Sequence, residues 1–188
     1  NPNSGKTSTF NQLTGAKQTV GNWPGVTVER KAGRLRKDRH VLIQDLPGIY
    51  SLSPYTPEEL ISRNYLMEAS LDAVINIIDG TNLERNLYLT VQLREMGIPC
   101  IVALNMLDIA RSQRIRIDID GLARRLGCPV VPLVSTRADG IDELKAAIDS
   151  LQLPQAALAV DYPPAIQAQV GYLLETRAPA ASAIEPRW

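Results

Sequence analysis

The first eight residues have the types and spacing of a phosphate-binding loop. They read Asn1, Pro2, Asn3, Ser4, Gly5, Lys6, Thr7 and Ser8, and match G-x-x-x-x-G-K-[ST] from its second position onward. Gly5 lets the backbone approach a phosphate, and successive N–H groups around it form an anion site at a helix N-terminus. Lys6 adds a positive charge for the β- and γ-phosphates, and the Thr7 hydroxyl is placed to bind Mg²⁺.

A second motif has the form D-x-x-G and reads Asp45, Leu46, Pro47 and Gly48, directly after a predicted strand. An aspartate at the carboxyl end of a buried strand can hold a water on Mg²⁺. Gly48 offers its backbone N–H to a γ-phosphate without steric obstruction. The motif predicts where the metal and the terminal phosphate of a nucleotide lie.

Two further motifs predict that the base is guanine. An N-x-x-D sequence follows another predicted strand and reads Asn105, Met106, Leu107 and Asp108. Guanine presents N1–H and N2–H₂ groups that one carboxylate accepts together, so Asp108 would select it while Asn105 braces the loop. After the next strand comes a turn of Ser135, Thr136 and Arg137, where a backbone N–H would contact the guanine oxygen. Each motif alone is common, but their order after successive strands is not.

These motifs require strands that end together at one edge of a sheet. Apolar strands predicted over 73–79, 98–104 and 130–134 alternate with helices predicted over 5–14, 83–96, 118–126 and 141–151. The alternation favours right-handed βαβ units, and so an α/β fold with a mainly parallel central sheet flanked by helices. Phe10 and Leu13 should face inward on the first helix, and Thr56 should cap a further helix together with Glu59.

The segment between the first helix and this sheet has weaker signals. Residues 15–27 contain three glycines and no periodicity, which predicts a mobile loop with Trp23 exposed. Strands are expected over 26–36 and 39–45, joined by a turn at Lys37-Asp38. A phosphate-binding loop normally follows a central strand, so we expect that strand to precede Asn1 in the complete protein.

Composition excludes several classes of protein. The 188 residues are 45% hydrophobic, which is enough for a packed core. Twenty basic and twenty acidic residues cancel, so bulk charge does not indicate binding to nucleic acid. Cys100 and Cys128 have no ligand-like neighbours and are expected to be buried, reduced thiols. No apolar run approaches the roughly 18 residues of a membrane span.

Longer segments resemble the GTPase domain of the bacterial ferrous-iron transport protein B (FeoB) family, over roughly residues 1–150. They are VGNWPGVTVERK at 20–31, DLPGIYSLSPY at 45–55 and NLERNLY at 82–88. Residues 153–188, with the YPP and PRW sequences at 162–164 and 186–188, resemble the start of that family's helical domain, which slows GDP release. The resemblance implies a Ras-like P-loop GTPase domain over 1–152 and an incomplete all-helical domain over 153–188.

The resemblance also implies roles for single residues. Thr7 and Asp45 would bind Mg²⁺, and Thr27 would join them only when the γ-phosphate is present. Gly25 and Val26 would contact the nucleotide beside Thr27. In this family K⁺ replaces an arginine finger. Asn3 and the carbonyls of Gly21 and Trp23 would bind the K⁺ here.

Hydrolysis would then depend on Lys6, Thr27, Gly48 and Asn3. Ile49 stands where Ras-like enzymes carry a water-orienting glutamine, and an isoleucine cannot orient water. Turnover of GTP to GDP should therefore be slow without assistance.

Two functions of different class fit these patterns. The first is a GTPase switch at the cytoplasmic face of the bacterial inner membrane that regulates Fe²⁺ import, with its own helical domain and a membrane permease as partners. The second is a free-standing GTPase that acts on RNA or the ribosome. Zero net charge and the 20–31 segment favour the first, which needs GTP, Mg²⁺ and K⁺ but no nucleic acid. Homo-oligomerisation stays open, and a nucleotide-holding module without turnover is weakened by the intact Lys6, Thr7, Thr27 and Asp45.

Overall fold

The structure is a computed structural model that describes residues 1–15, 18–24, 28–36, 40–69, 71–151, 153 and 155–176. Its centre is a parallel sheet of β4 (Val74–Asp79), β5 (Cys100–Asn105) and β6 (Val130–Pro132), in that order. Val74 pairs with Cys100 and Asp79 with Asn105, so the carboxyl ends of β4 and β5 lie side by side. The parallel sheet predicted from the sequence is confirmed.

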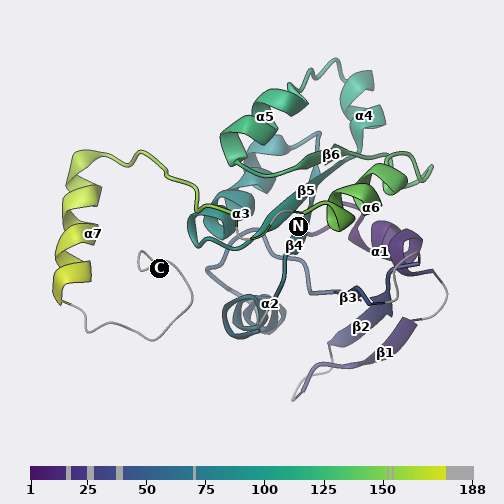
Figure 1. Ribbon diagram of the computed structural model, residues 1–188, viewed down its shortest axis with the longest axis horizontal. Helices are drawn as coiled ribbons and strands as arrows, with labels where there is room; N and C mark the ends of the chain where they lie inside the picture. Colours follow the sequence, from purple (N-terminus) through teal and green to yellow (C-terminus); the bar gives the residue numbers. More distant parts are fainter. Residues whose placement is uncertain are drawn as a thin grey trace.

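Helices cover both faces of this sheet (Figure 1). One face carries α1 (Lys6–Thr14) and α6 (Ile141–Asp149), and the other carries α2 (Pro57–Glu68), α3 (Leu83–Glu95) and α5 (Ile119–Leu126). Side chains of β5 alternate between the two cores: Val102 and Leu104 join the α3 side, and Ile101 and Ala103 join the α1 side. A strand buried on both faces has this continuous apolar sequence.

A separate antiparallel sheet corrects the prediction for residues 15–27. It consists of β1 (Gln18–Asn22), β2 (Glu29–Arg34) and β3 (Leu42–Gln44). All five residues of β1 pair with β2, although we predicted a loop there. The strand has no alternating apolar pattern, and Val20 is 58% exposed, because pairing with β2 rather than burial defines β1. The predicted turn at Lys37-Asp38 lies outside the described residues.

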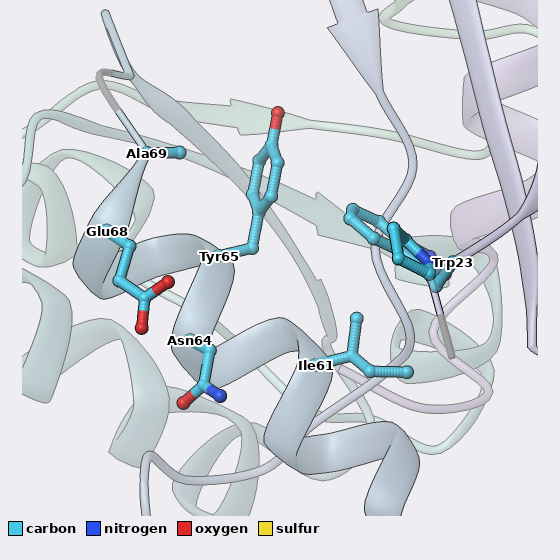
Figure 2. A pocket seen from close by; sticks show the side chains of 7 residues that line it. Trp23, Ile61, Asn64, Tyr65, Glu68 and Ala69 are labelled. Atoms are coloured by element: carbon cyan, nitrogen blue, oxygen red, sulfur yellow. The ribbon is translucent and has the colours of Figure 1, made fainter. Parts of the chain in front are cut away.

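Trp23, which follows β1, is buried and not exposed as predicted. Only 7% of its surface is accessible, and its ring meets that of Tyr65 edge-on at 5.2 Å between centroids. Ile61 and Tyr65, one helical turn apart, lie on the side of α2 that faces Trp23 (Figure 2). The guanidinium of Arg30 lies 5.1 Å from the Trp23 ring centroid. Trp23 therefore packs the carboxyl end of β1 against α2.

One local prediction is confirmed by the structure, and one short helix was missed. The Thr56 cap is confirmed, since its hydroxyl accepts from the Glu59 N–H at 3.2 Å and Glu59 accepts from the Tyr55 N–H at 2.8 Å. Helix α4 (Leu107–Ser112) was not predicted. It begins inside the N-x-x-D motif because Met106, at φ 61°, reverses the chain after β5.

The two cysteines are buried, as predicted, and form a contact that their sequence separation conceals. A hydrogen bond between the thiols, reinforced by burial, raises the pKa of Cys100 well above its usual value, while the same bond lowers the pKa of Cys128. Both side chains belong to the core on the α3 side of the sheet. The pair joins the amino end of β5 to the segment before β6.

The chain continues past α6 to α7 (Pro164–Thr176), which stands apart from the sheet and its helices (Figure 1). Residues 177–188, including the predicted PRW ending, lie outside the described part. Over the described residues, no helix combines the length and apolar character needed to cross a membrane.

Candidate nucleotide-binding site

The phosphate-loop motif lies at the start of α1, as the sequence predicts. Gly5 caps the helix with φ 87°, and Asn3 is also left-handed at φ 56°. A Cβ atom at Gly5 would collide with the side-chain amide of Asn105 and lie 2.9 Å from the Ser135 hydroxyl. Glycine is therefore required here both by backbone angle and by space. Thr7 and Asn3 are exposed at this end of the helix.

The D-x-x-G motif meets this loop. Lys6 Nζ lies 2.7 Å from Asp45 Oδ1 in a part-buried ion pair. A Cβ atom at Gly48 would lie 2.9 Å from both the N and Cα atoms of Pro2, so the two backbones are in close contact. The structure thus brings together two motifs that are about 40 residues apart in the sequence.

Asn105 connects the phosphate loop to the guanine-side turn. Its Nδ2 donates to the Ser4 carbonyl at 2.8 Å and to the Ser135 hydroxyl at 2.9 Å. Its Oδ1 accepts from the Ser135 N–H at 2.9 Å. All three residues are buried. The bracing role predicted for Asn105 has a clear geometric basis in these three bonds.

The guanine-side motifs lie at the same edge of the sheet. Asp108 is in the first turn of α4, with its Oδ2 3.7 Å from the Arg137 guanidinium. Leu107 places its side chain in the core, so only its backbone can face a nucleotide. Thr136 is exposed beside Arg137. The carboxylate predicted to select guanine stands next to the turn predicted to contact the guanine oxygen.

Sequence reasoning missed two sets of contacts that hold this site. Gln12 and Ser8, one turn apart on α1, both donate to the Ser135 carbonyl. Asn1 Nδ2 donates to Asn76 Oδ1 at 3.2 Å and to the Asn86 carbonyl at 3.3 Å. The i, i+4 spacing of Ser8 and Gln12 was an available signal. Nothing in the sequence pattern pointed to Asn76 or Asn86.

Positive charge at the phosphate loop comes from Lys6. Among the described residues, no cluster of three or more His, Cys, Asp or Glu side chains could bind a metal ion. Gly21 lies in β1 and Trp23 just beyond it, whereas Gly25, Val26 and Thr27 lie outside the described residues.

The cavity shown in Figure 2 is separate from these motifs. It measures about 450 Å³ and lies between the β1–β2 hairpin and α2, lined by Trp23, Pro24, Ile61, Asn64, Tyr65, Glu68 and Ala69. None of the phosphate-loop or guanine-side residues lines it. We therefore place the candidate site at the carboxyl edge of the parallel sheet.

Two sequence comparisons agree on the relatives of this chain. The family model described as Ferrous iron transport protein B matches residues 1–148. The Fe(2+) transporter FeoB of Salmonella choleraesuis (strain SC-B67) is 53% identical over 193 residues. The chain belongs to the ferrous iron transport protein B family.

Its FeoB relatives are longer than this chain. The Salmonella alignment covers 100% of the chain and 25% of the relative. The Fe(2+) transporter FeoB of Escherichia coli (strain K12) is 58% identical over 167 residues, which cover 86% of the chain and 22% of the relative. The chain thus spans about a quarter of the length of these relatives.

Solved FeoB structures share the fold. A mutant NFeoB of S. thermophilus bound to GDP has a TM-score of 0.88 and 45% identity, covering 100% of this chain and 72% of that one. The cytosolic domain of L. pneumophila FeoB has a TM-score of 0.86 and 42% identity, covering 93% of this chain and 77% of that one. The cytosolic domain of T. maritima FeoB in GDP form II has a TM-score of 0.88 and 36% identity, covering 99% of this chain and 75% of that one. The Ras-like P-loop GTPase fold expected from the sequence is confirmed.

Proposed function

We propose that this chain is a guanine-nucleotide switch domain that binds GTP, hydrolyses it slowly with K⁺ stimulation, and regulates ferrous iron uptake. The observation that carries the proposal is the Asn105 side chain, which bonds both Ser4 in the phosphate loop and Ser135 in the guanine-side turn. One buried amide holds the two halves of a nucleotide site in register. The GDP-bound FeoB domains of S. thermophilus and T. maritima support the same reading.

The proposed nucleotide contacts follow the three motifs. Residues 1–8 and 45–48 would surround the phosphates, residues 25–27 would join them, and residues 105–108 and 135–137 would hold the base. Lys6 and the Gly48 N–H would meet the γ-phosphate. The Asp108 carboxylate would accept from guanine N1–H and N2–H₂.

The residues at the start of α1 fit Mg²⁺. Asp45 and Thr7 offer the hard oxygen ligands that this ion prefers. The Asp45 carboxylate is 2.7 Å from Lys6, so it stands where the loop lysine would meet the phosphates. Thr27 is the third proposed ligand. When bound, Mg²⁺ neutralises charge on the β- and γ-phosphate oxygens.

Hydrolysis has to proceed without a glutamine after Gly48. Ile49 is buried in the core with Leu52 and Leu66, so this position supplies no polar group. We assign stabilisation of the transition state to Lys6, the Gly48 N–H, Thr27 and a K⁺ held by Asn3. The carbonyls of Gly21 and Trp23 would complete the K⁺ site. An arginine in that role is worth about 10³ to 10⁵ in rate.

Competitive binding tests the guanine site. In Mg²⁺, GTP and GDP should bind this chain at least about fivefold more tightly than ATP and ADP, because a bidentate base contact discriminates by about 1–3 kcal/mol. Equal affinities would refute the guanine assignment. Release of phosphate from GTP at the rate of a protein-free blank would refute hydrolysis.

The transport role can be tested in a chimera. This chain would replace the corresponding domain of E. coli FeoB in cells that lack their own FeoB, where the proposal places it at the cytoplasmic face of the inner membrane with the permease as partner. Uptake of Fe²⁺ should be restored, and Lys6→Ala in the chimera should remove the restoration. Full uptake with Lys6→Ala would show that nucleotide binding by this domain does not regulate transport.

A further inference from the structure

The two cysteines of this chain lie opposite each other at the amino ends of neighbouring parallel strands. Val102 of β5 pairs with Val130 of β6, and Cys100 and Cys128 each stand two residues earlier. The Val102 N–H donates to the Pro129 carbonyl at 2.9 Å, so the parallel pairing extends back to the residue after Cys128. Both cysteines belong to the core on the α3 side of the sheet, as expected for residues in register.

This placement fits the geometry of a disulfide. Neighbouring strands lie about 4.8 Å apart, inside the Cα separation of about 4.4–6.8 Å that a disulfide spans. In the structure both side chains are free thiols, and they share a hydrogen bond. A bond between the two sulfur atoms therefore needs little movement of the strands.

A buried guanidinium lies beside the pair. Arg94 is 1% exposed and donates to four backbone carbonyls, those of Ile98, Leu126, Gly127 and Ala156. The first of these residues comes shortly before Cys100, and the next two come directly before Cys128. Among the described residues, no carboxylate forms an ion pair with Arg94. Because a buried charge without a countercharge is costly, these surroundings favour an anion beside Arg94.

Cys128 is the thiol that can supply this anion. The hydrogen bond from Cys100 lowers the pKa of Cys128, and the charge of Arg94 lowers it further, against the opposing effect of burial. The same hydrogen bond, together with burial, raises the pKa of Cys100, so Cys100 keeps its proton. The thiolate is the nucleophilic form of cysteine. Cys128 is thus suited to attack an oxidant, and Cys100 to react second.

We propose that Cys100 and Cys128 are a peroxide-reactive pair that closes to a disulfide. The Cys128 thiolate attacks one oxygen of hydrogen peroxide, the O–O bond breaks, and hydroxide leaves and takes up the proton that Cys128 had released to solvent. The Cys100 sulfur then attacks the sulfur of the Cys128 sulfenic acid. Its S–O bond breaks, and the departing hydroxide takes the Cys100 proton. Two thiols and one peroxide give one disulfide and two waters, and the sulfur atoms lose the two electrons that the peroxide gains.

The burial of the pair limits which oxidant can reach it. Cys128 is 6% exposed and Cys100 is 0% exposed. A small molecule such as hydrogen peroxide can reach Cys128, whereas a peptide disulfide such as oxidised glutathione is too large to do so. Neither cysteine belongs to the nucleotide motifs, so this chemistry does not depend on GTP binding.

Peptide mapping of the whole reduced chain tests the pair. The chain has no other cysteine, so only one intramolecular disulfide can form. After hydrogen peroxide, blocking of free thiols and digestion, the peptides that contain Cys100 and Cys128 should be joined, and dithiothreitol should separate them. Separate peptides that keep free thiols, or that gain oxygen on the cysteines without joining, would overturn the pair. Oxidised glutathione at equal concentration should leave both thiols free, and a glutathione adduct would overturn the assignment to peroxide.

Two matched variants test the order of the two steps. Cys100→Ser removes the second thiol, so peroxide should add oxygen to Cys128, as measured on its peptide. Cys128→Ser leaves a buried, protonated Cys100, which the same treatment should leave unoxidised. Equal oxidation of the two variants, or none in either, would refute the assigned roles. Circular dichroism checks that both variants fold, and if one does not, the peptide map of the unsubstituted chain decides alone.

Discussion

At the scale of single residues, the base end of the site has a nearly balanced charge. Asp108 and Arg137 are 3.7 Å apart and both retain contact with solvent. Ion pairs of this kind contribute at most about 1 kcal/mol, because water screens them and long side chains lose freedom. The Asp108 carboxylate could therefore leave Arg137 at little cost to make the proposed contact with guanine.

Asp108→Asn should shift base preference from guanine to xanthine. An amide can donate to the xanthine O2 where the carboxylate accepted from the guanine N2–H₂. We expect GDP affinity to fall by about 10- to 100-fold, consistent with about 1–3 kcal/mol per bidentate pair, while xanthosine diphosphate gains affinity. Calorimetric titration with both nucleotides measures the change. Asp120→Asn, an exposed carboxylate on α5, is the control and should leave both affinities unaltered. Undiminished GDP binding by Asp108→Asn would exclude Asp108 from base recognition.

At the scale of elements, the site depends on buried amides that hold loops against strands. Asn105→Ala should leave the Ser4 carbonyl and the Ser135 N–H without their partner. Each unpaired buried group costs about 1–3 kcal/mol, so both stability and GDP affinity should fall. Thermal unfolding with and without GDP measures both effects. Asn64→Ala on α2 should change neither by a comparable amount. Unaltered GDP affinity in Asn105→Ala would show that the bridge between the two loops is dispensable.

Helix α2 offers a test of local stability. Thr56→Ala removes the hydroxyl that accepts from the Glu59 N–H and should destabilise the fold by about 1 kcal/mol. Thr56→Ser keeps the hydroxyl and should restore most of the loss. Urea denaturation compares the free energy of unfolding of the three proteins. If Thr56→Ser is as unstable as Thr56→Ala, the cap is not the source of the loss.

The elements that sequence predicts well are those with strong local signals. β4, β5 and α3 have long apolar runs or helical spacing, and Gly5, Lys6, Asp45 and Asn105 stand in motifs whose chemistry fixes their place. β1 has no such run, because antiparallel pairing with β2 defines it. The burial of Trp23 depends on Tyr65, 42 residues later, and one hydrogen bond of Arg94 goes to the Ala156 carbonyl, 62 residues later. Contacts of that range leave no periodic trace in a sequence.

At the scale of the molecule, the carboxyl and amino ends of the parallel strands make different contacts. The carboxyl edge, with Asn105, carries the candidate nucleotide site. The amino edge, with Cys100, binds the side-chain amide of Gln155. β5 and α3 run between these edges.

The whole site should respond to the choice of monovalent cation. Ile49 lies in the core, and the proposed mechanism takes its extra positive charge from K⁺ at Asn3. GTP turnover should be at least about tenfold faster in KCl than in NaCl at equal ionic strength, a small part of the 10³ to 10⁵ that an arginine supplies. Phosphate release in the two salts measures this. Asn3→Ala should equalise the rates. Equal rates in the unsubstituted chain would remove the potassium site from the mechanism.

The packing of Trp23 gives the molecule an optical signal of its own. The chain has two tryptophans, at positions 23 and 188, so Trp188→Phe would leave one indole. That indole touches Tyr65 on α2 and Arg30 on β2, and it emits from a nearly water-free setting. Its emission maximum should move to longer wavelength whenever Trp23 separates from α2. Ultraviolet fluorescence could therefore follow that separation in unlabelled protein, in real time.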